Sequence, residues 1–324
     1  MNRSAGSIGE RKDSGKIRGD WLDETVKNGR LGEQLEVFMA FRTMAVDSAK
    51  ELVGLLAGLK EEENDDTLLL GPRWDQGRFA RKARSARALV SDNDGTVIAG
   101  SQWLDMRTCM TETHQAADAE DAASYFRGDR TDEGDVRFIF ASVNRLRQSG
   151  VTECQLRRLA AEQKPRGGVQ KLFRSFARGN TALVSFGLRS YPSAWADHHD
   201  VPVGEVHALN LTWREEDGMR VLDGCDASTV VTEATKGRAR ARFCAARNVE
   251  EQDVIVLEDT PRMLVRMRHA DNLAILIIPR HDPQPMRTEE RLRQLGEDGH
   301  FEGIDGFLVA DDWHLLVAMR RGEF

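Results

Sequence analysis

Two aspartates one residue apart follow a short apolar run. They are Asp92 and Asp94, within Val-Ser-Asp-Asn-Asp-Gly-Thr-Val at residues 90–97. Like charges at the end of a buried strand repel each other and are costly to remove from water. A polar turn would explain them, because Asp, Asn and Gly are common turn residues. A site in which one carboxylate attacks a substrate and the other moves protons, with a cation beside both, would explain them equally well.

Further reactive side chains stand beside later apolar runs. Ser185 ends the run TALVS, Glu258 and Asp259 follow DVIVL, and Lys236 opens a predicted helix rich in alanine and arginine. Taken singly, Ser185 suits a turn and Lys236 a solvated surface, and the two acids before Thr-Pro suit a helix cap. Because each stands at the end of a strand or the start of a helix, their succession along the chain favours a shared site.

Together these groups suit phosphoryl transfer through a covalent aspartyl phosphate. The attacking carboxylate must stay ionised, and Mg²⁺ can offset its repulsion with the phosphate, since this cation binds one or two carboxylates together with phosphate oxygens. A lysine and a hydroxyl then balance the remaining phosphate oxygens. The second acid protonates the leaving oxygen and later activates water.

The elements that must position these groups resemble a parallel sheet. Five short apolar runs alternate with helix-like segments, which is typical of strands that helices cover on both faces. The runs are ALV at 88–90, TALVS at 181–185, DVIVL at 253–257, LAILII at 273–278 and GFLVA at 306–310. Ligands of such sheets bind beyond the carboxyl ends of the strands, so the reactive side chains are expected to meet there. The predicted fold class is α/β with a Rossmann-like parallel sheet.

Residues 86–324 resemble the haloacid dehalogenase-like (HAD) superfamily of phosphatases. The segment DNDGT is similar to the first motif of that family, which implies Asp92 as nucleophile and metal ligand. It also implies Asp94 as general acid and base, with its backbone carbonyl on the metal. The segment LVSFG resembles the second motif, which implies Ser185 as the phosphate-binding hydroxyl and Gly187 as a backbone donor to the phosphate.

The third and fourth motifs complete the resemblance. Lys236 in TKG resembles the phosphate-binding lysine, and VIVLEDTPRM resembles the motif that makes Asp259 a metal ligand. The commonest form of the fourth motif is Gly-Asp with another Asp four residues later. Here Glu258 stands in the glycine position and Met263 in the position of the later acid. Whether Glu258 joins the Mg²⁺ ligands directly is therefore open.

The resemblance also predicts a division of the chain. Residues 86–100 and 165–324 are expected to form the core, and residues 101–164, with amphipathic helical patterns, a cap like that of the phosphoserine-phosphatase-like branch. Residues 1–85 are expected to form an N-terminal helical extension, in which an apolar stripe predicts a helix from about Trp21 to Leu59. These N-terminal helices could pack on the core, extend the cap or join two chains in a homodimer.

The function expected from the resemblance is hydrolysis of a small phosphorylated metabolite. Phosphoserine is disfavoured, because an amino group needs a cap carboxylate soon after the first motif and no acid occurs there before Asp105. The cap residues considered for substrate contact are Trp103, Arg107, His114 and Arg127. Two alternatives stay open, namely a phosphomutase or phosphotransferase on the same core and a catalytically silent binding protein.

Composition narrows the partners. A formal net charge of −7 argues against nucleic acid as the main partner. No apolar run approaches the roughly 20 residues that span a bilayer, and the N-terminus lacks the apolar stretch of a secretory signal. Four scattered cysteines form no metal or disulfide pattern, so a cytoplasmic protein is expected. The basic segment at residues 73–87 either contacts phosphate or forms a solvated helix, and the solvated helix is favoured.

Overall fold

A computed structural model describes most of the chain. It covers residues 42–59, 66–127, 131–281, 295–296 and 300–323. Backbone contacts divide the chain into residues 1–39 and 40–324, and the fold below is that of the second unit. Most of the helix predicted from Trp21 lies outside the described residues.

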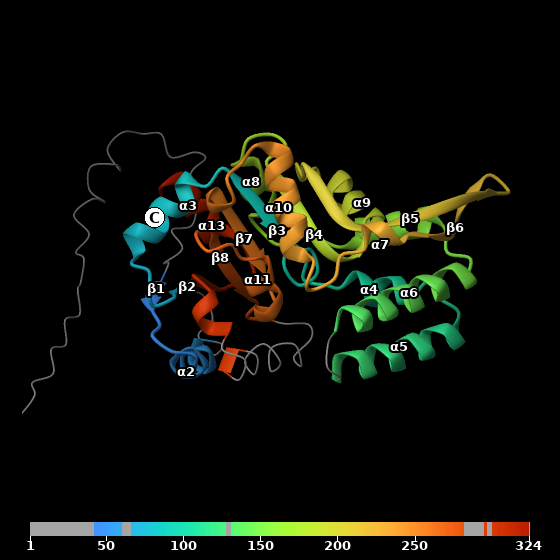
Figure 1. Cartoon of the computed structure of the whole chain (residues 1–324), viewed down its shortest axis with the longest axis horizontal. Helices are drawn as coiled ribbons and strands as arrows, with labels where there is room; N and C mark the ends of the chain where they lie inside the picture. Colours follow the sequence, from blue (N-terminus) through green and yellow to red (C-terminus); the bar gives the residue numbers. More distant parts are fainter. Residues whose placement is uncertain (1–41, 60–65, 128–130, 282–294, 297–299, 324) are drawn as a thin grey trace, which may run out of the picture. The chain divides into compact units, whose positions relative to one another are not determined.

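Nine strands of the described chain form one mixed sheet (Figure 1). Their order is β1-β2-β9-β8-β7-β3-β4-β5-β6. The run from β9 to β5 is parallel, whereas β2 is antiparallel to β9 and β6 is antiparallel to β5. The strands are β1 (Arg42–Ala45), β2 (Thr67–Leu70), β3 (Ala88–Ser91), β4 (Thr181–Leu188), β5 (Glu205–Glu216), β6 (Met219–Asp226), β7 (Val254–Glu258), β8 (Leu273–Ile278) and β9 (Gly306–Val309). All five predicted apolar runs are confirmed as strands.

Helices cover both faces of the sheet. Alternate residues of each strand point to opposite faces, so Leu89 of β3 packs in one apolar cluster with Phe79, while Val90 packs in the other with Phe243. The first cluster includes residues of α3 (Gln76–Ser85), α8 (Val169–Arg174) and α13 (His314–Arg321). The second includes residues of α2 (Ala49–Leu59), α10 (Lys236–Arg247) and α11 (Pro261–Met267). Burial on both faces explains why these strands are continuous apolar runs.

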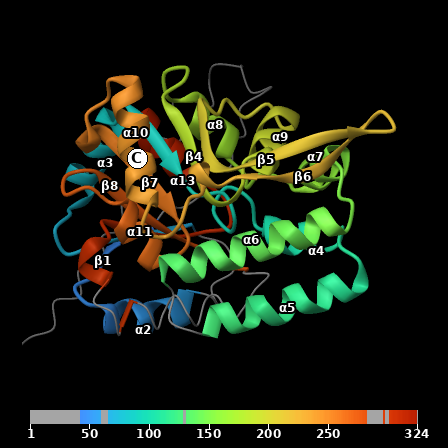
Figure 2. The ribbon, with the colours of Figure 1, turned by 45° about the vertical axis from the view of Figure 1, so that its right-hand side comes forward.

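The residues predicted as a cap are helical. They form α4 (Gln102–Arg107), α5 (Glu112–Arg127), α6 (Asp132–Gln148) and α7 (Glu153–Glu162), and α9 (Ser190–His198) follows β4. Figure 2 shows α5 and α6 side by side, with the long β5–β6 hairpin extending beside α6 and α7. The hairpin is joined to this helical region where the backbone N–H of Leu222 donates to the carbonyl of Val151 (2.8 Å). No helix among the described residues is long and apolar enough to cross a bilayer.

The N-terminal boundary predicted at residue 85 is wrong for the described residues. Residues 42–45 form strand β1 rather than helix, and β2 lies between β1 and β9 in the core sheet. Within the predicted helix, the helical residues described are Ala49–Leu59. The cause is that β2 contains four residues, all buried, which is too short for a periodic pattern to register. Strands β1 and β2 thus belong to the same sheet as the predicted core.

Candidate active site

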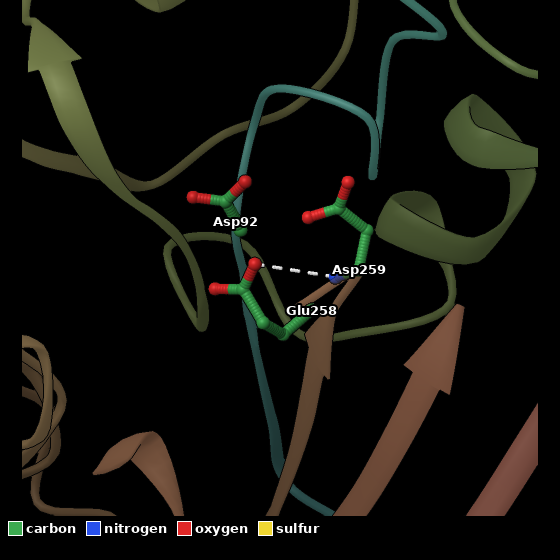
Figure 3. A group of neighbouring side chains, drawn as sticks. All are labelled: Asp92, Glu258 and Asp259. Atoms are coloured by element: carbon green, nitrogen blue, oxygen red, sulfur yellow. Dashed lines mark hydrogen bonds between the residues drawn. The ribbon is translucent and has the colours of Figure 1, made fainter. Parts of the chain in front are cut away.

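The reactive side chains predicted from the sequence converge at the carboxyl ends of neighbouring parallel strands. Asp92 follows β3, Glu258 ends β7 and Asp259 follows it. Figure 3 shows these three carboxylates turned toward one another from the two strand ends. All seven predicted site residues line one pocket: Asp92, Asp94, Ser185, Gly187, Lys236, Glu258 and Asp259. The expected meeting place is confirmed, whereas the roles of these residues stay predictions.

Ser185, which lines the pocket, lies in an irregular stretch of β4. The pairing of β4 with β5 shifts between Val184 and Leu188, and such bulges re-aim side chains beside active sites. The buried Ser185 hydroxyl accepts a hydrogen bond from the backbone N–H of Gly187 (3.1 Å). A Cβ at Gly187 would lie 2.0 Å from the side chain of Gln102, so this close approach requires glycine.

Gln102 joins the site although the sequence did not single it out. Its buried side-chain amide donates to Ser185 Oγ (2.9 Å) and to Asp94 Oδ1 (3.2 Å). The amide oxygen accepts from the backbone N–H of Leu188 (2.9 Å). Gln102 therefore ties the hydroxyl of β4 to the second aspartate. A single glutamine carries no spacing or charge pattern that could have revealed this position.

Four donors orient the carboxylate of Asp94. Oδ1 accepts from the side chains of Asn93 (2.7 Å) and Gln102 (3.2 Å), and Oδ2 accepts from Ser101 Oγ (3.2 Å) and the backbone N–H of Gln102 (2.9 Å). The side chain of Asp94 is outside the group of three carboxylates at the strand ends. Its predicted metal contact, through the backbone carbonyl, stays a prediction.

Lys236 is fully buried between two carboxylates. Its Nζ lies 2.7 Å from Asp92 Oδ1 and 2.6 Å from Glu258 Oε2. The side chain comes from the first residue of α10, where the sequence predicts a helix start. Burial lowers the pKa of Lys236, but the charges of Asp92 and Glu258 outweigh burial and raise the pKa above its ordinary value. The ammonium therefore stays charged at neutral pH.

The two carboxyl groups facing Lys236 are harder to ionise than usual. Burial raises the pKa of Asp92; Lys236 lowers it and Asp259 raises it further. Burial also raises the pKa of Glu258, as does the charge of Asp92, while Lys236 lowers it. When all three acids are ionised, one ammonium cannot balance them, so this end of the pocket favours an additional cation.

The donor set fits Mg²⁺. Asp92, Glu258 and Asp259 are buried, and each offers an oxygen that lies within 4.8 Å of the others. Carboxylate oxygens are the ligands that Mg²⁺ prefers in proteins. Met263 lines the pocket at the position of the missing acid but supplies no oxygen ligand. Glu258 thus stands close enough to ligate a cation, although it now pairs with Lys236.

The remaining wall of the pocket is aromatic. Tyr125 and Phe138 stack with their ring centroids 4.8 Å apart, and Phe186 lies 6.1 Å from Tyr125. Trp103 meets Phe138 edge to face at 5.6 Å. All four side chains line the pocket. Among the predicted cap contacts, Trp103 is therefore placed at the site.

Two other cap candidates hold helices together instead. Arg107 of α4 donates to the buried Asp118 of α5 (2.9 Å). His114 of α5 is hydrogen-bonded through Nδ1 to Ser149, which follows α6 (3.0 Å). The side chain of Arg127 lies outside the described residues.

Replacing Lys236 by Met is expected to destabilise the fold in a pH-dependent way. Removing one partner of a buried ion pair typically costs about 3–5 kcal/mol. Without Lys236, the carboxyl groups of Asp92 and Glu258 lose the charge that lowers their pKa, so the pKa of each rises further above its ordinary value in the folded state. The folded variant then binds protons at these two groups more tightly than the unfolded chain does, so its free energy of unfolding falls as pH rises above about 4.5. The loss should therefore be larger at pH 8 than at pH 5.

Urea unfolding with chelator present would measure this loss. Lys50→Met, at an exposed position of α2, is the matched control and should change the free energy of unfolding by less than about 0.5 kcal/mol. An equal loss at both pH values in Lys236→Met would contradict the charge balance described above.

Comparison with known proteins gives matches in structure. No protein-family model and no curated protein matches the sequence. The crystal structure of cytosolic 5'-nucleotidase IIIB bound to cytidine matches with a TM-score of 0.54 and 15% identity, over 76% of this chain and 91% of that one. A phospho-aspartyl intermediate analogue of phosphoserine phosphatase matches with a TM-score of 0.47 and 12% identity, over 70% of this chain and 93% of that one.

The likeness to the nucleotidase concerns the fold alone, because the identity is 15%. It agrees with the mainly parallel sheet, flanked by helices on both faces, that the elements themselves display. The chain shares the α/β fold of this nucleotidase, with the Rossmann-like parallel sheet that the sequence predicted.

Proposed function

We propose that the protein is a Mg²⁺-dependent phosphatase that hydrolyses a small phosphomonoester through an aspartyl phosphate on Asp92. The observation that carries the proposal is the convergence of three buried carboxylates, a buried lysine and a buried hydroxyl on one pocket, with Asp94 beside them. Each of these groups has a distinct task in phosphoryl transfer.

The first half-reaction starts from Asp92. A carboxylate oxygen attacks phosphorus while the bond to the leaving alcohol breaks, and Asp94 gives the alcohol oxygen its proton. The Ser185 hydroxyl accepts hydrogen bonds from Gln102 and Gly187, which leaves its own proton to donate to a phosphate oxygen. Mg²⁺ held by Asp92, Asp259 and, where it ligates directly, Glu258 would offset the negative charge that gathers there.

The second half-reaction hydrolyses the aspartyl phosphate and restores the free enzyme. Asp94, now ionised, takes a proton from water, and the hydroxide attacks phosphorus and frees Asp92. Lys236 holds Asp92 in place from 2.7 Å and keeps positive charge beside it throughout. The four hydrogen bonds hold the Asp94 carboxylate in one orientation, which supports its use in proton transfer.

The aromatic wall of the pocket indicates which kind of substrate the site favours. Trp103, Tyr125, Phe138 and Phe186 line the pocket in which the leaving group would lie. Among the described residues, no charged cap side chain lines it. This wall favours an alcohol with a flat apolar part over phosphoserine, whose amino and carboxyl groups call for charged partners. The nucleotidase that shares the fold is described with cytidine, a ligand with a flat ring.

Removal of the divalent cation is expected to reduce turnover of 4-nitrophenyl phosphate by roughly 10²–10³-fold. A metal ion contributes several kcal/mol of charge stabilisation in such reactions. Here it would offset the repulsion between the Asp92 carboxylate and the negatively charged phosphate. Steady-state rates with and without chelator, followed by repletion with Mg²⁺, would measure the effect. Full turnover in a chelated sample would refute the proposed metal dependence.

A further inference from the structure

A second cavity of about 690 Å³ lies at the other end of the sheet. It is lined by residues of α3, of the loop at 270–272 that precedes β8, and by Asp305, which precedes β9. Because β8 and β9 run parallel to β3 and β7, these linings stand at the amino ends of strands, whereas Asp92 and Glu258 stand at carboxyl ends. The second cavity is thus separate from the proposed active site.

One face of α3 supplies basic side chains to this cavity. Arg78, Arg81, Lys82 and Ser85 all line it, and their spacing of three, four and seven residues places them on one side of a helix. The other side is anchored in the core by Phe79, which is 1% exposed. A rigid, well-packed helix therefore presents three cations together.

A fourth cation is fixed at the rim of the cavity. Asp305, 1% exposed, accepts hydrogen bonds through Oδ1 from Arg73 and Trp74 (both 2.8 Å) and through Oδ2 from the backbone N–H of Ala274 (2.9 Å). The guanidinium of Arg78 lies 5.0 Å from the centre of the Trp74 ring. Asp305 is therefore fully engaged in holding the rim and does not neutralise α3.

The basic side chains of α3 outnumber the acids of the cavity lining, which among the described residues are Asp305 and the exposed Asp271. Among the described residues, Arg78, Arg81 and Lys82 form no ion pair, although the whole chain carries a net charge of −7. Asn272, which lines the same cavity, is 1% exposed, and neither atom of its side-chain amide has a hydrogen-bond partner in the described chain. Buried amides normally have partners, and a polar ligand would supply one.

We propose that this cavity binds a small soluble molecule carrying two or more phosphate groups. Its volume lies in the range of roughly 300–1,000 Å³ that is usual for small-molecule sites. Arginine and lysine are the side chains that recognise phosphate most strongly, through charge-assisted hydrogen bonds. Several cations on one rigid face match several phosphates rather than one. Under this proposal the basic segment at residues 73–87 contacts phosphate, which was the less favoured of the two explanations drawn from the sequence.

Titration calorimetry of the full chain with inorganic pyrophosphate, in chelator, tests the proposal. We expect saturable binding that weakens at least about tenfold in Arg81→Gln and in Lys82→Gln, since each loses a charged hydrogen-bond donor. The matched control is Arg84→Gln, with the same substitution on the same helix at an exposed position that does not line the cavity. That control should bind pyrophosphate as the unmodified chain does.

The active site needs a separate control because it also suits phosphate. Ser185→Ala should leave the affinity for pyrophosphate unchanged if binding occurs at the α3 cavity. Binding that Ser185→Ala abolishes while Arg81→Gln spares would place the anion in the active site and overturn the proposal. Absence of binding at millimolar pyrophosphate, or equal weakening by Arg84→Gln, would overturn it as well.

Discussion

We expect Asp92→Asn to form no phosphoenzyme with 4-nitrophenyl phosphate, and Asp94→Asn to accumulate one. An amide at residue 92 cannot attack phosphorus, so the first half-reaction fails with any substrate. In Asp94→Asn the nucleophile and Lys236 remain in place, and a nitrophenolate leaving group needs little protonation. The second half-reaction lacks its base and should slow by about 10²–10⁴-fold. The phosphorylated intermediate should therefore build up.

The surroundings of Asp94 require a check on folding. Each carboxylate oxygen of Asp94 accepts two hydrogen bonds, so the NH₂ group of an asparagine must face at least one donor. The Ser101 hydroxyl can turn to accept, whereas the backbone N–H of Gln102 cannot. Thermal unfolding of Asp94→Asn should be compared with that of Asp197→Asn, which makes the same substitution at an exposed position.

Rapid-quench mass spectrometry would locate the phosphoryl group. A mass gain of one phosphoryl group on the peptide containing Asp92, in Asp94→Asn alone, would support the mechanism. Phosphorylation of Asp92→Asn, or of a residue elsewhere, would refute it. A wild-type phosphoenzyme that persisted in water and passed its phosphate to an added alcohol would favour the phosphotransferase alternative.

The site was predictable because its residues occupy the ends of buried elements. Asp92 and Glu258 stand where apolar runs stop, and parallel strands bring such positions together whatever their separation in the chain. The Gln102 contacts were not predictable, since they depend on a bulge in β4 and on the absence of a side chain at Gly187. Those are properties of the packed backbone, which no local pattern encodes.

Strand β2, near the edge of the sheet, was not predictable from the sequence. Strand β2 is Thr-Leu-Leu-Leu and follows an acidic run, so its few residues resemble the end of a loop as much as a strand. Its place between β1 and β9 depends on pairing with residues 306–309, far along the chain. Pairing between strands that are distant in the sequence can decide whether a short segment becomes a strand, whatever its local sequence pattern. The boundary predicted at residue 85 was wrong for that reason.

This position of β2 predicts that a chain beginning at residue 84 will fail to fold. The deletion removes β1, α2, β2 and nearly all of α3, and with them the cover of both faces at this end of the sheet. Leu68 packs in one apolar cluster and Leu69 in the other, both fully buried. Strand β9 would become an exposed apolar edge, which promotes aggregation. Insoluble or unfolded protein is the expected result, measured by circular dichroism and gel filtration.

A point substitution separates this explanation from a simple loss of chain length. Leu69→Ala should lower the free energy of unfolding by about 2–5 kcal/mol, the usual cost of emptying a buried leucine site. Met44→Ala, in the neighbouring strand β1 but 38% exposed, should change it by about 0.5 kcal/mol or less. Denaturant unfolding of both full-length variants measures the difference. If the shortened chain folded and Leu69→Ala were as stable as Met44→Ala, β2 would not be part of the core, because a buried central strand cannot lose a leucine without cost.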